Sequence, residues 1–144
     1  MTAPLDPVID AKVRASFGAQ AMMTTLGARL ESLAQGAVTI SAEVTAALTQ
    51  QQGFSHAGLI FSIGDSAAGY SALTMMPEEA EVMTVEMKIN LLSPGAGRLV
   101  AEGRVIRPGK RLVVVAADVW ADDPSDRRRH VAMLQGTMIP VDRG

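Results

Sequence analysis

The longest stretch of apolar and small residues runs from Ala57 to Met76, and Asp65 is its single charged side chain. A helix that is apolar on every side is a buried helix. Pro77 follows directly and breaks the helical pattern. The pattern therefore predicts a long core helix over these residues, packed under a sheet.

Upstream of this stretch, the pattern predicts one helix and two strands. Residues Pro7 to Leu26 begin with a predicted helix, for which Asp10 is a candidate N-cap. Alternating apolar and polar positions then predict strands at Ala28–Ala34 and Ala37–Thr45, joined at Gln35-Gly36. The alternation in the second strand implies that one of its faces is exposed to water.

Four more strands are predicted after the long helix. In the first of them, Met83 and Val85 alternate with Thr84, which places the methionine and the valine on the apolar face. The segment Arg107-Pro108-Gly109-Lys110 joins the second strand to the third and matches a type II turn, and a charged loop follows at 122–129. Short turns of this kind favour sequential hairpins. The four strands span Glu81–Leu92, Leu99–Ile106, Arg111–Trp120 and His130–Ile139.

Strands on both sides of one buried helix suggest an α+β fold in which an antiparallel sheet curls around that helix. The 144 residues suffice for one domain with its own core, so 1–144 is predicted to be a single domain, with 1–27 as an N-terminal helical segment. Such a sheet has edge strands whose backbone N–H and C=O groups are unpaired. Dimerisation through edge strands would protect them.

Composition narrows the range of partners. A net charge of −2 and an isoelectric point near 5.6 give no general affinity for nucleic acid or for anionic membranes. The absence of cysteine excludes disulfides and thiolate chemistry and agrees with a cytoplasmic protein. The two histidines lack partners at metal-binding spacing. We therefore expect no metal and no cofactor, and the N-terminus has no pattern typical of a signal peptide.

The apolar stretch is long enough to span a membrane, since about twenty helical residues cover the roughly 30 Å hydrocarbon layer. Its glycine, serine and threonine residues dilute the hydrophobicity, and Asp65 lies near the centre, where a charge is most costly. We therefore expect a helix in a protein core, with no membrane partner.

Asp65 requires an explanation, because loss of hydration disfavours an ionised carboxylate in an apolar environment. One interpretation is a satisfied buried acid, bonded to backbone donors or to a partner arginine. The other is a functional acid, since carboxylates with perturbed pKa values are enriched at functional sites.

Three segments together resemble a known family. They are Gln51 to Gly58 (QQGFSHAG), Asp65 nine residues after His56, and Val85 to Pro94 (VEMKINLLSP). At this spacing they resemble the PaaI-like acyl-CoA thioesterases of the hotdog superfamily, over Thr45 to Ile139. The resemblance implies a hotdog fold, dimers as the minimal unit with tetramers common, and hydrolysis of an acyl-CoA thioester.

The resemblance also implies roles for five residues. Asp65 matches the family's helix carboxylate, which acts as general base or nucleophile. His56 and Ala57 match the residues that bind the thioester carbonyl, with the Ala57 N–H as the oxyanion donor. Gln50 falls where several members have an asparagine that positions the water, and Thr84 where they have a serine or threonine in the site. Two departures are that alanine replaces the first glycine of the usual His-Gly-Gly and that glutamine is longer than asparagine.

The physical properties of these residues are consistent with such roles. Ala57 and Gly58 open the helix, so their N–H groups lack intrahelical partners and lie at the positive end of the dipole, which suits a developing oxyanion. The basic residues Arg107, Lys110 and Arg111 are candidates for the phosphates of CoA, although basic residues on a turn are often only solvated. Together with Gly58 they are the predicted substrate-binding residues.

The helix itself constrains the geometry of a site. Asp65 and His56 are nine residues apart, or about 13 Å along a helix axis, which is too far for both to reach one carbonyl. We therefore expect each site to combine two subunits of a homodimer, which is expected to form a homotetramer. A non-catalytic hotdog module that binds an acyl or aromatic ligand is the alternative, and a hotdog dehydratase would need a histidine and an acid disposed differently.

Overall fold

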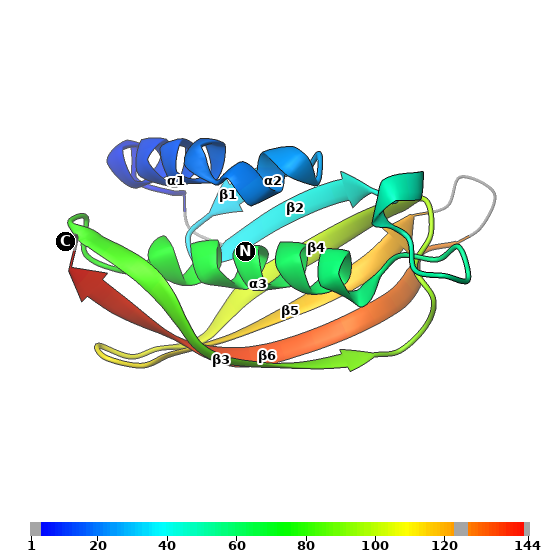
Figure 1. The fold of residues 1–144 in the computed structure, drawn as a ribbon. Helices are drawn as coiled ribbons and strands as arrows, with labels where there is room; N and C mark the ends of the chain where they lie inside the picture. The colour runs from blue at the N-terminus through cyan, green and yellow to red at the C-terminus, as the bar shows by residue number, and fades with distance from the viewer. Residues whose placement is uncertain (1–3, 123–126, 143–144) are drawn as a thin grey trace.

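A six-stranded antiparallel sheet curls around one long helix, and two shorter helices lie beside the sheet (Figure 1). The computed structural model describes residues 4–122 and 127–142. The predicted α+β architecture is confirmed. In chain order the elements are α1 (Pro7–Ala19), α2 (Ala21–Thr25), β1 (Arg29–Ala34), β2 (Ala37–Glu43), the 3-10 helix η1 (Ala46–Leu48), α3 (Ala57–Leu73), β3 (Ala80–Leu91), β4 (Arg98–Pro108), β5 (Val113–Asp122) and β6 (Arg129–Asp142).

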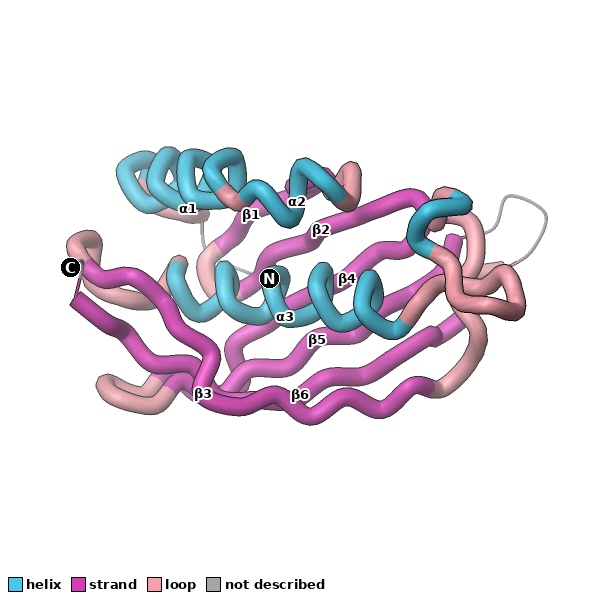
Figure 2. Tube along the Cα trace, in the orientation of Figure 1, coloured by secondary structure: helices cyan, strands magenta, loops and turns pink. Residues whose placement is uncertain are grey.

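The strand order is β1-β2-β4-β5-β6-β3, and every neighbouring pair is antiparallel. Sequential hairpins join β1 to β2, β4 to β5 and β5 to β6. The same prediction is wrong for β3, which lies at the far edge beside β6 (Figure 2). The connection after β3 runs across the end of the sheet, where the N–H groups of Leu92 and Ser93 both donate to the Val131 carbonyl, and it delivers β4 next to β2.

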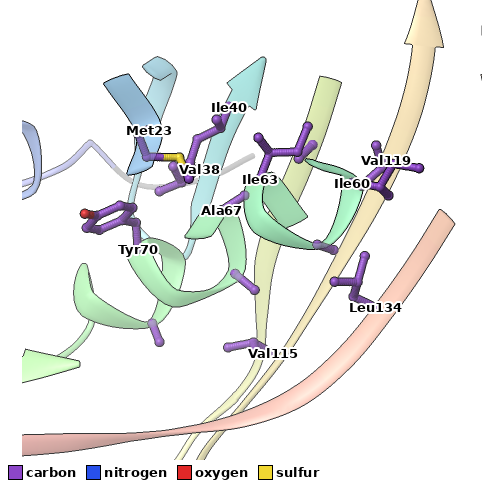
Figure 3. Close-up of a cluster of buried hydrophobic side chains, with 14 of the residues drawn as sticks. Met23, Val38, Ile40, Ile60, Ile63, Ala67, Tyr70, Val115, Val119 and Leu134 are labelled. Carbon is purple, nitrogen blue, oxygen red and sulfur yellow. The ribbon is translucent and has the colours of Figure 1, made fainter. Parts of the chain in front are cut away.

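The core lies between α3 and the concave face of the sheet (Figure 3). Helix α3 is buried over most of its length, including Ile63, Ala67 and Leu73, each 0% exposed. Burying one such aliphatic side chain contributes about 1.5–3 kcal/mol. The buried hydroxyl of Ser71 donates to the Ala67 carbonyl at 2.7 Å, so a polar residue is tolerated because the helix backbone satisfies it. Within the described residues, no helix is long and apolar enough to cross a membrane.

The helix and the sheet approach each other closely at Gly103 in β4. A Cβ atom built on this glycine would lie 2.3 Å from the carbonyl carbon and oxygen of Ala67. Backbone atoms cannot move aside as a flexible side chain can. Glycine is therefore required here by the packing of α3 on the sheet.

The predicted faces of β3 are wrong in its first half. A β-bulge between Thr84 and Glu86 shifts the register against β6, so that Thr84 and Met87, three residues apart, both face the helix. Met83 and Val85 are consequently exposed, at 56% and 54%. A bulge adds one unpaired residue to a strand and reverses the alternation beyond it, which simple periodicity does not predict.

The N-terminal helical segment is two helices, not the single helix expected. The chain leaves helical geometry at Gln20, whose φ and ψ are −81° and 98°. Asp10 is not the N-cap, because Asp6 precedes the helix and its Oδ1 accepts a hydrogen bond from the Val8 N–H at 2.8 Å. Pro7 then occupies the first helical position, where its missing N–H costs nothing.

The predicted type II turn is also wrong. Such a turn needs a positive φ at Gly109, and this glycine has none, whereas Gly27, Gly36, Gly53 and Gly97 do. Strand β4 instead continues through Pro108 before the turn begins. The predicted charged loop lies partly outside the described residues, at 123–126.

The close approach at Gly103 makes a testable prediction. We expect Gly103→Ala to lower the free energy of unfolding by about 3 kcal/mol or more, since overpacking a rigid site costs at least the usual 1–3 kcal/mol. The matched control is Gly18→Ala in α1, where an added Cβ meets nothing within 4 Å and a helical alanine is favoured by about 1 kcal/mol. Urea unfolding at one protein concentration measures both changes, and equal stabilities would contradict the packing argument.

Candidate active site

Asp65 lies in the middle of α3 and faces the bulged segment of β3. Its side chain is partly buried, and its Oδ1 accepts a hydrogen bond from the Thr84 hydroxyl at 2.9 Å. The hydroxyl also lies 3.2 Å from the sulfur of Met138 on β6. The bulge of β3 thus brings the two predicted residues together, with one carboxylate oxygen anchored.

The environment of Asp65 favours its protonated form. Burial raises the pKa of Asp65 above its ordinary value, and the hydrogen bond from Thr84 opposes that rise with a smaller effect. Within the described residues, no ion pair involves this carboxylate. A carboxylate that is desolvated without a cationic partner is a stronger base than an exposed one.

A pocket of about 190 Å³ opens beside Asp65. It lies between α3, β3, the C-terminal end of α1 and the buried Met138. Polar groups dominate its wall. It is lined by Ser16, Gln20, Asp65, Ser66, Gly69, Tyr70, Glu81, Val82, Thr84 and Met138.

His56 is the N-cap of α3. Its ring Nδ1 accepts a hydrogen bond from the Gly58 N–H at 2.8 Å, so this N–H is already engaged. The Ala57 N–H is the first of the helix, and among the described residues it has no hydrogen-bond acceptor. Two N–H groups were expected to be available to a substrate. Of these, the Gly58 N–H is engaged by His56, and the Ala57 N–H remains available.

The loop before α3 holds these groups in place through backbone hydrogen bonds. The His56 N–H donates to the Leu48 carbonyl at 2.9 Å, and the Ser55 N–H donates to the Gly95 carbonyl at 2.8 Å. The Gln50 N–H donates to the Phe54 carbonyl, also at 2.8 Å. This loop is therefore fixed to both η1 and the connection between β3 and β4.

A second pocket, of about 510 Å³, lies along this loop. The C-terminal end of β3 and the start of α3 form its other walls. It is lined by Gln50, Gln51, Gln52, Phe54, Ser55, His56, Ala57, Ile60, Leu91, Leu92, Ser93, Pro94 and Gly95.

The predicted site residues therefore fall into two groups on one chain. Asp65 and Thr84 line the smaller pocket, whereas Gln50, His56 and Ala57 line the larger one, and no residue lines both. This separation agrees with the distance argument from the sequence. Asp65 and the Ala57 N–H therefore do not meet in one pocket of a single chain.

The predicted CoA-binding residues are not brought to either pocket within one chain. Arg107 near the end of β4 and Lys110 and Arg111 on the turn before β5 are exposed, at the end of the molecule opposite the loop before α3 (Figure 1). Within the described residues, no three His, Cys, Asp or Glu side chains gather as metal ligands.

Sequence reasoning missed the polar wall that the N-terminal segment adds to the Asp65 pocket. Ser16 and Gln20 lie four residues apart near the end of α1 and reach the Tyr70 hydroxyl at 3.1 and 3.0 Å. The four-residue spacing indicates that the two side chains share one helix face. That a buried tyrosine would meet this face was not readable from the sequence.

Comparison with known proteins identifies the class. The sequence model of the thioesterase superfamily matches residues 52–127. A thioesterase family protein from Silicibacter pomeroyi has a solved structure that is 40% identical, with a TM-score of 0.90 over 94% of this chain and 99% of that one. The PaaI protein of Escherichia coli, from the phenylacetic acid degradation operon, is 22% identical and has the same fold, with a TM-score of 0.83 over 95% of this chain and 96% of that one.

A relative from Saccharolobus solfataricus, named as an esterase, is 37% identical over 99 residues. The match covers 68% of this chain but 64% of that relative, so the chain spans less than two thirds of its length. The fold is that of a hotdog protein of the thioesterase type. The chain belongs to the thioesterase superfamily, whose name states its chemistry, the hydrolysis of thioesters.

The raised pKa of Asp65 makes a prediction for stability. The folded chain binds this proton more tightly than the unfolded chain, so the contribution of Asp65 to the free energy of unfolding is most favourable below the unfolded pKa, about 3.9. It falls as the pH rises through the folded pKa. We therefore expect Asp65→Asn to be more stable than the parent at neutral pH, by a margin that shrinks on acidification. Urea unfolding of both proteins across this range measures the margin, and one that is constant or grows in acid would contradict the assignment.

Proposed function

We propose that the protein is an acyl-CoA thioesterase whose active sites are each built from two subunits. The loop pocket of one subunit would bind the thioester carbonyl, and Asp65 of the other subunit would supply the base. The observation that carries this proposal is the placement of the acid and the free Ala57 N–H in separate pockets of one chain. We further propose that the protein is cytoplasmic and that its dimers associate into tetramers.

The edge strand β3 supports a dimer of this kind. Within the described residues β3 pairs with β6 alone, and an unpaired edge of twelve residues invites another strand. Antiparallel pairing of two β3 strands about a twofold axis sets the start of one beside the end of the other. Val82 and Thr84 line the Asp65 pocket, while Leu91 and Leu92 line the loop pocket. Such pairing therefore places the Asp65 pocket of each subunit beside the loop pocket of the other.

Charge and exposed apolar surface favour one register for this pairing. An axis at Met87 sets Glu86 of one strand opposite Lys88 of the other, and opposite charges across an antiparallel pair are stabilising. Val85 and Leu91 are 54% and 53% exposed on the same strand, so the dimer would also remove apolar surface from water.

The chemistry follows from these groups. The Asp65 carboxylate takes a proton from a water molecule, and the resulting hydroxide attacks the thioester carbonyl carbon. The Ala57 N–H at the positive end of α3 stabilises the oxyanion that forms. The C–S bond then breaks, the free acid is released, and the CoA thiolate takes up the proton. Release of CoA from a panel of acyl-CoA thioesters would separate this function from that of a binding module.

A proline at position 57 would remove the N–H, and the alanine side chain that it replaces has no role in the proposed chemistry. Proline is favoured at the first position of a helix, and the preceding residue, His56, already has the extended geometry that a following proline requires, with φ −62° and ψ 142°. We expect Ala57→Pro to lower kcat by about 10²–10³, as for other oxyanion donors. The control, Ala57→Gly, keeps the N–H and should keep the activity. Steady-state kinetics on any acyl-CoA that the parent hydrolyses tests both, and full activity in the proline variant would rule out the donor.

The shared site predicts complementation between two inactive proteins. Asp65→Asn should lower activity by at least about a hundredfold, since it removes the general base. When it is unfolded and refolded with Ala57→Pro, half of the randomly paired dimers are mixed. Each mixed dimer has one site with an intact loop and an intact acid, so activity should return to about a quarter of that of the parent.

Two controls make the complementation decisive. Each variant refolded alone must stay inactive, and mixed dimers are verified by a different affinity tag on each chain. If verified mixed dimers are no more active than the two variants alone, the acid and the donor act within one chain, and the shared-site geometry is wrong.

A further inference from the structure

The Asp65 pocket contains a hydrogen-bonded cluster that the chemistry above does not use. The Tyr70 hydroxyl accepts a hydrogen bond from Gln20 Nε2 at 3.0 Å and lies 3.1 Å from the Ser16 hydroxyl. The Ser66 hydroxyl donates to Gln20 Oε1 at 3.3 Å. All four side chains line the same pocket as Asp65, so the cluster faces whatever group occupies it.

Tyr70 anchors this cluster to the core. Its side chain is 6% exposed, and its ring packs edge-on against Phe17, with 6.2 Å between the ring centroids. The hydroxyl points away from the labelled aliphatic side chains of the core (Figure 3). The ring therefore serves packing, while the hydroxyl is presented to the pocket and to the N-terminal helices.

Gln20 lies at the break between α1 and α2, which is not caused by a proline or a glycine at that residue. Its amide makes both of its contacts within the cluster. One N–H of that amide and one lone pair of Oε1 have no partner among the described residues. The cluster therefore retains a donor and an acceptor that a ligand in the pocket can use.

The size of the pocket limits what it can hold. A cavity of about 150 Å³ accommodates benzene, so the 190 Å³ beside Asp65 admits one ring or a short acyl chain. A larger hollow, of about 770 Å³ between α1 and the start of β3, shares Ser16, Gln20, Tyr70 and Glu81 with it. Three of the four members of the cluster therefore line both cavities.

We propose that Tyr70, Gln20 and Ser16 select the acyl group of the substrate, an inference that rests on the thioesterase function proposed above. The selected acyl group is no larger than a phenyl ring and bears a hydroxyl or carbonyl that bonds to the cluster. An apolar acyl group of the same size displaces water from the cluster and leaves these polar groups unpaired, which is the strongest form of discrimination by a binding site.

The test compares CoA thioesters of matched size on the full-length protein. The first pair is 3-hydroxybutyryl-CoA and butyryl-CoA, and the second is 3-hydroxybenzoyl-CoA and benzoyl-CoA. We expect the parent to show kcat/KM at least about tenfold higher for the hydroxylated member of one pair or both. Tyr70→Phe keeps the ring and removes the hydroxyl, and Gln20→Met keeps the length and removes the amide. Each should lower that preference by about tenfold, because the hydroxylated thioester loses a hydrogen-bonding partner and the unsubstituted thioester no longer leaves that polar group unpaired.

The matched control is Ser71→Ala. It removes a hydroxyl from the same helix that is fully buried and bonded to the Ala67 carbonyl, outside the pocket, and it should keep the preference of the parent. Hydrolysis with no preference in the parent, or with a preference that survives both cluster variants, overturns the inference and leaves the thioesterase function standing. If the parent hydrolyses none of the four thioesters but hydrolyses another acyl-CoA of the panel, the inference is overturned and the thioesterase function stands, whereas failure on the whole panel overturns both.

Discussion

The contact between α3 and the concave face of the sheet is the constraint on which the other features of this protein depend. The sheet curls around the apolar helix and buries it, and at Gly103 the two backbones come so close that a side chain is excluded. Depth of burial then sets the chemistry of the single acid that the helix contains. Asp65 lies close enough to the core to lose much of its hydration, and close enough to a pocket to meet a ligand.

The same helix serves two functions that conflict in a single chain. Its first turn offers a backbone donor at the positive end of the dipole, and its middle offers a base, but a straight helix keeps these groups apart. The proposed dimer resolves this conflict. Strand β3 borders the Asp65 pocket at its start and the loop pocket at its end, so pairing two β3 strands brings the acid of one subunit near the backbone donor of the other. In that arrangement the subunit interface is part of the catalytic apparatus and also protects an open sheet edge.

Much of this arrangement is predictable from the sequence, because periodicity reports burial. The uninterrupted apolar stretch predicted α3, and alternation predicted the strands and most of their faces. Three features were not predictable for physical reasons. The bulge at Thr84 adds one residue to a strand without a local marker, the position of β3 at the sheet edge depends on a long-range connection, and the helix break at Gln20 is made where tertiary hydrogen bonds form.

The bulge in β3 constrains which insertions and deletions the protein can accept during evolution. Deleting the extra residue would give a more regular strand, with the same pairs to β6 and no unpaired residue at this point. It would also turn Thr84 away from Asp65 and exchange the residues that the edge presents to a partner. Selection on stability and selection on chemistry therefore oppose each other at one position. We expect insertions and deletions to accumulate in the loops of this fold and to be purged from the middle of this strand.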